Sequence, residues 1–253
     1  MLITYMAASL GSRQRHDQYK ANKCCYLVRT LKYPVMSNRL FAPGCALILY
    51  KPELAFKLHS ILNKNLGEME MLMTCCHHDP KLKQATLIIN ICPGCDKRFR
   101  SDYENSSTIS LWEILAESDF FTFPDYQSQS MTIIDACPTR DQERIHLAIR
   151  KLLLKMNINL IEPKSTGTNS TCCGDSFYGI IPTEKVKDQM IRKASELPLN
   201  DVVVYCISCS KAMFVGGKQP HYLIDLLFAE ETVSKTFEPD DWHNELSTYM
   251  DKH

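Results

Sequence analysis

The sequence lacks net charge and long apolar segments. Its 253 residues contain 29 Lys and Arg against 29 Asp and Glu, so the bulk charge gives no reason to expect binding to nucleic acid or to an anionic membrane surface. No apolar run approaches the roughly 20 residues that span a bilayer. Residues 1–13 have neither an early positive charge nor a convincing cleavage site, unlike a signal peptide. We therefore expect a cytoplasmic protein with no integral membrane segment.

Several signatures of cofactor binding and catalysis are also missing. The sequence contains no phosphate-binding loop, no G-x-G-x-x-G turn and no Ser/His/Asp set. The bacterial ferredoxin run, C-x2-C-x2-C-x3-C-P, is absent as well. These absences argue against nucleotide, flavin and nicotinamide chemistry and against ordinary electron-relay cubane clusters.

Cysteine, in contrast, is abundant, and its pattern repeats. In a reducing compartment, patterned cysteines are more often metal ligands or redox groups than disulfides. Ten of the twelve cysteines form two sets with the same order: a single cysteine, an adjacent pair and a Cys-x-x-Cys motif. The first set is Cys45, Cys75, Cys76, Cys92 and Cys95, and the second is Cys137, Cys172, Cys173, Cys206 and Cys209. Cys24 and Cys25 belong to neither set, and we interpret them as incidental thiols.

The sequence around the cysteines repeats too. "ATLIINICPGC" (85–95) and "NDVVVYCISC" (200–209) are apolar, β-branched runs that end at a Cys-x-x-Cys motif, as expected for buried parallel strands. Amphipathic helices are expected after them at 111–117 and 223–230. Their acidic residues, Glu113 and Asp225, occupy matching positions, and we interpret both as structural.

The repeat predicts an α/β fold, a tandem duplication of a small parallel-sheet unit that forms two pseudo-symmetric subdomains. We place an N-terminal extension at 1–40, the first subdomain at 41–124 and the second at 125–253. The cysteine sites should lie at the carboxyl ends of strands, near the interface between the halves. Further elements are expected as follows: a helix at 52–66, a strand at 131–136, a helix from a Thr139/Gln142 capping box to about Met156, and a helix at 184–197 after a Thr183 cap.

Five cysteines per repeat indicate a polynuclear centre. Thiolate is a soft ligand suited to zinc, copper(I) and iron–sulfur clusters. A Cys-x-x-Cys motif at the start of a helix faces free backbone N–H groups and the positive end of the helix dipole, which lowers cysteine pKa. Structural zinc needs only four ligands. An adjacent pair needs a turn that lets both sulfurs point to one place, and Gly174 supplies the required backbone freedom.

The order Cys…Cys-Cys-Gly…Cys-x-x-Cys, present twice, resembles the cysteine-rich CCG domain of heterodisulfide reductase. The same domain occurs in iron–sulfur subunits of anaerobic glycerol-3-phosphate dehydrogenase and of lactate- or glycolate-oxidising complexes. The resemblance covers residues 41 to about 230, and "FAPGC" (41–45) and "ICPGC" (91–95) also look like the family. It implies a non-cubane [4Fe–4S] cluster held by the five cysteines of each set.

The first set departs from the family pattern. His77 stands where the family has glycine, and only 15 residues separate Cys76 from Cys92, whereas 32 separate Cys173 from Cys206. About one helix is therefore missing from the first repeat, and zinc is a possible occupant of that site. His77 and His78 could replace a ligand, although a solvated pair in a loop is the plainer interpretation. His221, before the last repeat helix, is expected to cap it or to form a hydrogen bond with a metal-binding residue.

The resemblance implies an iron–sulfur oxidoreductase subunit that passes single electrons to a disulfide or another small redox substrate, with Cys172 and Cys173 as ligands at the substrate site. Electrons would come from a partner subunit, a ferredoxin-type protein or a flavoprotein. Two alternatives stay open: a non-catalytic electron-transfer subunit between a flavin dehydrogenase and quinone, and a zinc-stabilised interaction module.

Overall fold

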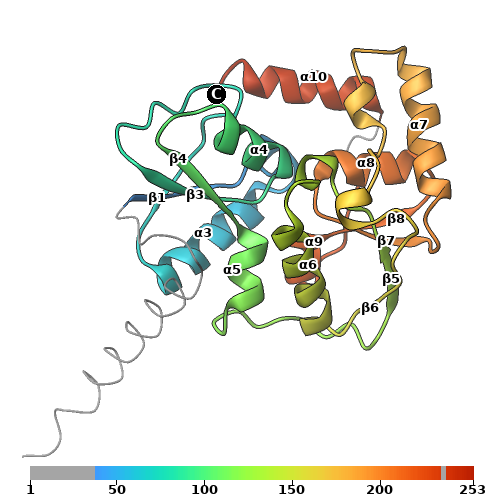
Figure 1. Ribbon diagram of the computed structural model, residues 1–253, viewed down its shortest axis with the longest axis horizontal. Helices are drawn as coiled ribbons and strands as arrows, with labels where there is room; N and C mark the ends of the chain where they lie inside the picture. The colour runs from blue at the N-terminus through green and yellow to red at the C-terminus, as the bar shows by residue number, and fades with distance from the viewer. Residues whose placement is uncertain (1–37, 235–237) are drawn as a thin grey trace, which may run out of the picture.

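The computed structural model describes residues 38–234 and 238–253 of the chain. Within these ranges, the strands form two four-stranded sheets, one in each half of the sequence, and every pairing inside them is parallel (Figure 1). The expected class, an α/β fold built from a duplicated parallel-sheet unit, is confirmed. The extension expected at 1–40, with Cys24 and Cys25, falls almost entirely outside the described residues.

The two halves are built from the same kinds of elements. The first half contains β1 (Asn38–Ala42), α2 (Cys45–Tyr50), α3 (Pro52–Leu66), β2 (Glu70–Met71), β3 (Thr86–Asn90), α4 (Pro93–Ser101), β4 (Ser106–Ser110) and α5 (Leu111–Glu117). The second half contains β5 (Ser130–Ile133), the 3-10 turn η1 (Cys137–Thr139), α6 (Glu143–Lys155), β6 (Asn159–Leu160), the 3-10 turns η2 (Gly167–Asn169) and η3 (Asp175–Phe177), α7 (Thr183–Ser195), β7 (Asp201–Val204), α8 (Ile207–Val215), β8 (Gln219–Tyr222) and α9 (Leu223–Leu227). A last helix, α10 (Pro239–Met250), follows. The expected boundary at 124/125 falls in the segment between α5 and β5.

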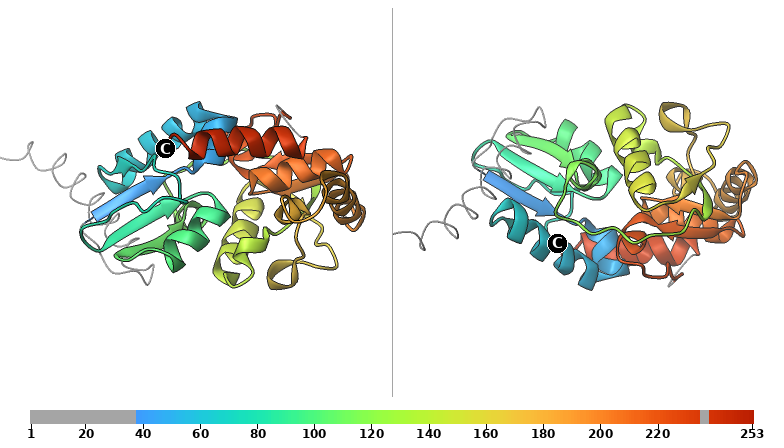
Figure 2. Two further views of the ribbon diagram at one scale, coloured as in Figure 1. Left: turned by 90° about the horizontal axis from the view of Figure 1, so that it is seen from above. Right: turned by 90° about the horizontal axis from the view of Figure 1, so that it is seen from below.

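Both sheets have the same strand order, β2-β1-β3-β4 and β6-β5-β7-β8. In the first sheet, the chain goes from the central strand β1 to the edge strand β2, and then crosses to β3 and β4 on the other side of β1. The second sheet follows the same path from β5 to β6 and then to β7 and β8. Right-handed crossovers therefore place α3 and α4 on opposite faces of the first sheet, as Figure 2 shows. The direction reverses between β1 and β3, and again between β5 and β7. In open parallel sheets, ligands bind at such switch points, outside the carboxyl ends of the strands.

The strands before the two Cys-x-x-Cys motifs have the composition that a doubly covered sheet requires. All five residues of β3 are buried, and so are Val202, Val203 and Val204 of β7. Helices on both faces exclude water from such strands, and continuous apolar runs fit that environment. The helices expected at 52–66 and 111–117 form at those residues as α3 and α5.

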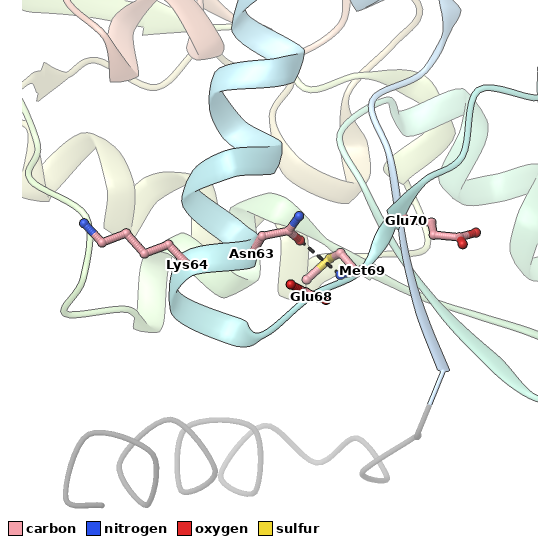
Figure 3. Close-up of a pocket in the computed structure, with 5 residues that line it drawn as sticks. All are labelled: Asn63, Lys64, Glu68, Met69 and Glu70. Atoms are coloured by element: carbon pink, nitrogen blue, oxygen red, sulfur yellow. Dashed lines mark hydrogen bonds between the residues drawn. The ribbon is translucent and has the colours of Figure 1, made fainter. Parts of the chain in front are cut away.

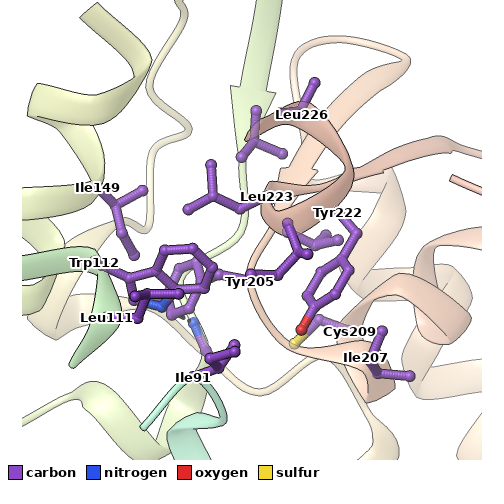
Figure 4. Packing of buried hydrophobic residues seen from close by; sticks show 14 of the residues in the cluster. Ile91, Leu111, Trp112, Ile149, Tyr205, Ile207, Cys209, Tyr222, Leu223 and Leu226 are labelled. Carbon is purple, nitrogen blue, oxygen red and sulfur yellow. Dashed lines mark hydrogen bonds between the residues drawn. The ribbon is translucent and has the colours of Figure 1, made fainter. Parts of the chain in front are cut away.

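One apolar core joins the two halves. Ile91 and Trp112 from the first half pack with Tyr205 and Leu223 from the second, as Figure 4 shows. Trp112 and Tyr205 are among the largest fully buried side chains. Because the halves share this core, the carboxyl ends of the two sheets are held in a fixed relation. No helix within residues 38–234 and 238–253 is long and apolar enough to span a bilayer.

Two pseudo-equivalent ion pairs cross between the halves. Lys51, between α2 and α3, lies 2.7 Å from Asp225 of α9, whose side chain is completely buried. Arg144, at the start of α6, lies 2.8 Å from Glu113 of α5. In each pair, the acidic residue lies on the last helix of one repeat, α5 or α9. The basic residue lies at the start of the long helix of the other half, α6 or α3. The structural interpretation of Glu113 and Asp225 is confirmed.

The capping box expected at Thr139 and Gln142 is wrong. Thr139 ends the η1 turn, where its hydroxyl donates to the carbonyl of Ala136 at 2.7 Å, and α6 begins only at Glu143 after Gln142. The hydroxyl therefore stabilises the turn that carries Cys137 instead of a helix end.

Two further boundaries differ from expectation. Thr183 is the first residue of α7 and not its cap, because its hydroxyl donates to Asp240 of α10 at 2.9 Å. The helix expected at 223–230 ends at Leu227, since Ala229 adopts a left-handed conformation with φ 53°.

The helix missing from the first repeat is α7, which has no counterpart between β2 and β3 in the described part of the chain. Helix α10 instead runs from the second half, where it contacts α7, across to the first half, where it contacts α2 (Figure 1). It therefore brings a helix of the second half to the side of the first repeat that lacks one.

Candidate metal centres

The first cysteine site forms at the carboxyl ends of β1, β2 and β3. Cys45 opens α2, and Cys75 and Cys76 lie in the loop after β2. Cys92 occupies the N-cap position of α4, and Cys95 lies in the first turn of that helix. The parallel sheet thus gathers five cysteines from three segments of the chain at one edge.

The second cysteine site has the same construction at the carboxyl ends of β5, β6 and β7. Cys137 opens the η1 turn, and Cys172 and Cys173 lie just before η3. Cys206 occupies the N-cap position of α8, with Cys209 in its first turn. The sequence-based placement of both sites at strand ends agrees with the structure.

The thiols of each site are neighbours in the same order. The order in the first site is Cys45, Cys75, Cys76, Cys95 and Cys92. The order in the second is Cys137, Cys172, Cys173, Cys209 and Cys206, with 3.9 Å between the sulfurs of Cys137 and Cys172. All ten are free thiols. The two halves therefore share the order of their cysteines both along the sequence and in space.

The first cysteine of each adjacent pair is the acidic one. Hydrogen bonds from Cys45 and Cys76 hold the pKa of Cys75 far below its usual range. Cys172 accepts hydrogen bonds from Cys137 and Cys173, and its pKa is lowered in the same way. The same contacts raise the pKa of the neighbouring thiols Cys45 and Cys137, so the negative charge of each set lies on the first cysteine of its pair.

Helix α4 adds to this effect at the first site. A hydrogen bond from Cys95, together with the backbone N–H groups of Cys95 and Gly94, lowers the pKa of Cys92 to about 7. These N–H groups belong to the first turn of the helix, where they have no partner within the helix. The expected stabilisation of a thiolate at the start of a helix is therefore present at Cys92.

The geometry of the sulfurs differs from that of a site for a single metal ion. Among residues 38–234 and 238–253, no group of three or more His, Cys, Asp and Glu side chains is placed to hold one ion. A tetrahedral zinc ion, with Zn–S distances of about 2.3 Å, needs its ligands around one point. Each set has five thiols, one more than the four ligands of a structural zinc ion. The residues present therefore fit a polynuclear centre better than they fit zinc.

Gly174 fixes the turn after the second adjacent pair. Its φ of 112° is unfavourable for any other residue, and a Cβ atom there would lie 2.8 Å from the backbone nitrogen of Met190 in α7. Its N–H donates to the sulfur of Cys172 at 3.3 Å. The expected role of this glycine in the pair's geometry agrees with these contacts.

A buried ionic network supports the second site, and sequence reasoning missed it. Asp135, two residues before Cys137, accepts hydrogen bonds from both terminal nitrogens of Arg150 at 2.6 and 2.7 Å. Tyr205 and the backbone of Gly167 also donate to this carboxylate, at 3.1 and 2.6 Å. The network ties the end of β5 to the segment that leads to Cys172. The signal in the sequence was a charged residue directly after the apolar run of residues 131–134.

The two sites face one another across the interface between the halves. Helix α2, which begins at Cys45, contacts α8, and α4 contacts the η1 turn that begins at Cys137. Tyr222 is buried between them: burial, and then the charges at Cys92 and Cys206, hold its pKa well above the usual range. The expected position of the sites near the interface therefore agrees with the structure.

The sites differ in their access to solvent. Cys75 is buried, with 2% of its surface exposed, and its backbone N–H donates to the carbonyl of His253 at 3.2 Å, just beyond α10. Its counterpart Cys172 is only partly buried and lines a pocket of about 350 Å³. The C-terminal segment thus covers the first site, whereas the second is open on the side of Cys172.

A larger pocket, of about 520 Å³, lies away from the cysteines between the end of α3 and β2 (Figure 3). Asn63, which accepts a hydrogen bond from the N–H of Met69 at 3.1 Å, lies at its centre. This region is at the opposite edge of the sheet from the cysteines and contains no nucleophile or buried charge, so we assign it no chemistry.

In the described part of the chain, His77, His78 and His221 belong to no group placed to hold a metal ion. His77 and His78 are exposed, and Nε2 of His78 lies 2.9 Å from the carbonyl of Met250, which agrees with a loop pair. His221 does not cap α9, because it lies in β8 with Nε2 2.7 Å from a carboxylate oxygen of Asp201 in β7. Its expected capping role is therefore wrong.

No family model, curated protein or solved structure matches this chain.

Proposed function

We propose that the protein is an iron–sulfur oxidoreductase subunit whose second cysteine site delivers single electrons to a disulfide or a related small sulfur substrate. The observation that carries the proposal is the gathering of five thiols at the carboxyl ends of the strands, at the switch point of each sheet. The donor set is entirely sulfur, and five ligands exceed the four of structural zinc, which favours a [4Fe–4S] centre of the non-cubane type.

Such a centre, when bound, would supply one-electron transfer and an open position for a sulfur ligand. The protein's part is to hold the ligands and to exclude water. At the second site, Cys173 and Cys209 are buried, whereas Cys172 borders the pocket. At the first site, Cys75, Cys76 and Cys95 are all buried. This asymmetry favours the second site as the place where substrate binds and the first as a site for electron transfer.

The overall reaction would be the reduction of a disulfide: one S–S bond is broken, two electrons and two protons are added, and two thiols form. The electrons must come from a ferredoxin-type protein or a flavoprotein. The described residues bring no further cysteine cluster to the surface as an electron entry point, so a partner subunit is part of the proposal.

The first test is chemical analysis of protein purified without oxygen. We expect iron and acid-labile sulfide in roughly equal amounts, and an electron paramagnetic resonance signal in the oxidised protein. The double variant C172S/C173S should lose the signal of the second site. The matched control is C24S/C25S, which removes the adjacent pair that belongs to neither repeat. Zinc in place of iron, or equal effects of the two double variants, would contradict the proposal.

A further inference from the structure

The fold holds the thiols of Cys137 and Cys172 side by side. Their sulfurs lie 3.9 Å apart, although the two residues are 35 positions apart in the chain. Two hydrogen bonds join the segments that carry them. Nε of Arg140 donates to the carbonyl of Ser170 at 2.7 Å, and the hydroxyl of Ser170 donates to the carbonyl of Asp135 at 2.8 Å. Because these contacts are made by protein atoms alone, they bring the two thiols together without help from a metal.

Cys172 is open to small oxidants. Its side chain lines the pocket of about 350 Å³, where Arg140 and Arg192 also lie. The hydroxyl of Ser176 and the backbone N–H of Gly174 lie 2.9 and 3.3 Å from its sulfur. Oxidation of cysteine favours sulfurs that solvent reaches and that have a second thiol nearby. Cys172 meets both conditions, with Cys137 as the second thiol.

Cys137 is a better disulfide partner for Cys172 than the adjacent Cys173. Protein disulfides usually join residues whose Cα atoms are about 4.4–6.8 Å apart. Neighbouring residues joined by a trans peptide, as Cys172 and Cys173 are, have Cα atoms only about 3.8 Å apart. A bond between them would therefore distort the backbone. Cys173 is also buried, with 4% of its surface exposed.

The equivalent pair of the first site is covered. Cys45 and Cys75 are neighbours in the same way, but Cys75 is only 2% exposed. Its backbone N–H donates to the carbonyl of His253 at 3.2 Å. A disulfide requires the two sulfurs to approach to about 2 Å. The cover keeps oxidants from Cys75, and the bond to His253 holds its backbone in place, so the first pair should react more slowly.

We infer that Cys137 and Cys172 form a disulfide when the second site holds no metal, and that this bond closes the site to metal until it is reduced. The oxidant is a peroxide. The sulfur of Cys172 attacks one peroxide oxygen, the O–O bond breaks, and a sulfenic acid and water form. The sulfur of Cys137 then attacks the sulfenic sulfur, the S–O bond breaks, and a second water leaves. Two thiols and one hydrogen peroxide thus give one disulfide and two waters.

The disulfide itself does not depend on the proposed function, whereas its effect on iron binding rests on that function. A bond between Cys137 and Cys172 removes two of the five thiols of the second site. Ligand thiols must be free to lose their protons before they bind a metal. The oxidised site would therefore stay empty, and the first site would keep its full set of ligands.

Peptide mapping by mass spectrometry on the full chain tests the bond. Protein purified without oxygen is freed of metal by a chelator under reducing conditions, separated from the reductant and treated with hydrogen peroxide. We expect the peptide of Cys137 to be linked to that of Cys172, roughly tenfold faster than Cys45 is linked to Cys75. The variant C173S should keep this link, and C172S should lose it. A link between Cys172 and Cys173 alone, no link, or equal rates in the two sites would overturn the inference.

Two arginine variants test whether the fold sets the distance between the thiols. Arg140 and Arg192 are both exposed, so replacement by glutamine should leave the fold intact. Arg140→Gln removes the hydrogen bond to Ser170 and should slow formation of the link severalfold, because the two segments are no longer joined at that point. The matched control, Arg192→Gln, removes a positive charge from the same pocket and leaves that hydrogen bond in place. Equal rates in the two variants would overturn the inference that the fold holds these thiols together.

Closure of the site is measured with cobalt(II), which binds thiolates without a reductant. We expect peroxide treatment to lower the thiolate-to-cobalt absorption of wild type, and reduction by a phosphine to restore it. In C45S/C75S, where the second site carries the signal, the loss should be larger than in wild type. Absorption that is unchanged in protein with the mapped disulfide would overturn the closure.

Iron and sulfide analysis of untreated protein separates this inference from the proposed function. Iron-containing protein that forms no link between Cys137 and Cys172 after metal removal would overturn the disulfide and leave the iron–sulfur proposal standing. Protein that forms the link but never contains iron would support the disulfide and overturn the iron–sulfur proposal.

Discussion

Replacing Gly174 with alanine tests whether the turn after Cys172 and Cys173 is fixed by close contact with α7. The backbone of Gly174 has φ 112° and ψ −30°, outside the regions open to alanine. A Cβ atom there would lie 2.8 Å from Cγ and from the backbone nitrogen of Met190. The helix backbone cannot move aside without disturbing the packing of α7.

The expected cost has two parts. A non-glycine residue in an unfavourable conformation with positive φ costs about 1–3 kcal/mol. Overpacking against a helix adds about 1–3 kcal/mol. Gly179 is a matched control in the same loop, because its φ is 75° and nothing lies within 4 Å of its Cβ position. Gly179→Ala therefore carries the conformational cost without the steric one.

The two variants are compared by thermal unfolding and by urea titration. We expect Gly174→Ala to lower the free energy of unfolding by about 2 kcal/mol more than Gly179→Ala does. For a chain of this length, that difference corresponds to roughly 4–8 °C in Tm. If the two variants lose equal stability, the contact with Met190 does not constrain the turn that carries Cys172 and Cys173.

Three further predictions concern the interface, the pH dependence and the C-terminal helix. Lys51→Met should lower the free energy of unfolding, measured in urea, by about 3–5 kcal/mol, because it leaves the carboxylate of Asp225 buried without its cation. Recovery of stability in K51M/D225N would confirm the cause. A loss below about 1 kcal/mol would refute it. Burial lowers the pKa of His146, so its contribution to stability is complete above about pH 6.5 and is lost as the pH falls below that value. The H146Q variant should therefore show a flatter dependence of unfolding free energy on pH from about pH 7 to 5. An unchanged pH dependence would refute this role of His146. Trp242→Ala removes a buried anchor of α10 and should speed alkylation of Cys75 severalfold by mass spectrometry, whereas unchanged labelling would show that α10 does not shield this thiol.

The repeat and its strands were predictable because they depend on local composition. The apolar runs before Cys92 and Cys206 are long enough to be buried parallel strands, and Pro52 and Gly67 limit the first long helix at both ends. A parallel strand that ends at a Cys-x-x-Cys motif can only place that motif at the carboxyl edge of a sheet. The α/β class and the location of both cysteine sites follow from those local facts.

Helix starts were predicted less well, because a hydroxyl group has several partners within reach in the folded chain. Thr139 matches a capping box in sequence but stabilises the η1 turn. Thr183 binds Asp240, a residue 57 positions away. A sequence pattern considers only hydrogen-bond partners that are close along the chain. The fold brings residues that are distant in sequence within hydrogen-bond distance of the same hydroxyl.

The charges around the second site were not predictable for the same reason. Arg140 follows the η1 turn, whereas Arg192 and Lys193 are neighbours on α7, and the three meet only when α7 packs beside the loop of Cys172. Asp135 and Arg150 pair across the turn between β5 and α6. The spacing of residues along the chain does not predict these contacts.

The sequence by itself determined the duplicated α/β unit and the gathering of five cysteines at each sheet edge, because strand burial and the direction of parallel strands are local properties. The tertiary structure alone decided that the sites differ in exposure. The first repeat lacks a helix, α10 reaches across from the second half to cover Cys75, and Cys172 is left facing a basic pocket. That difference depends on contacts between segments far apart in the chain, which only the packed molecule brings together.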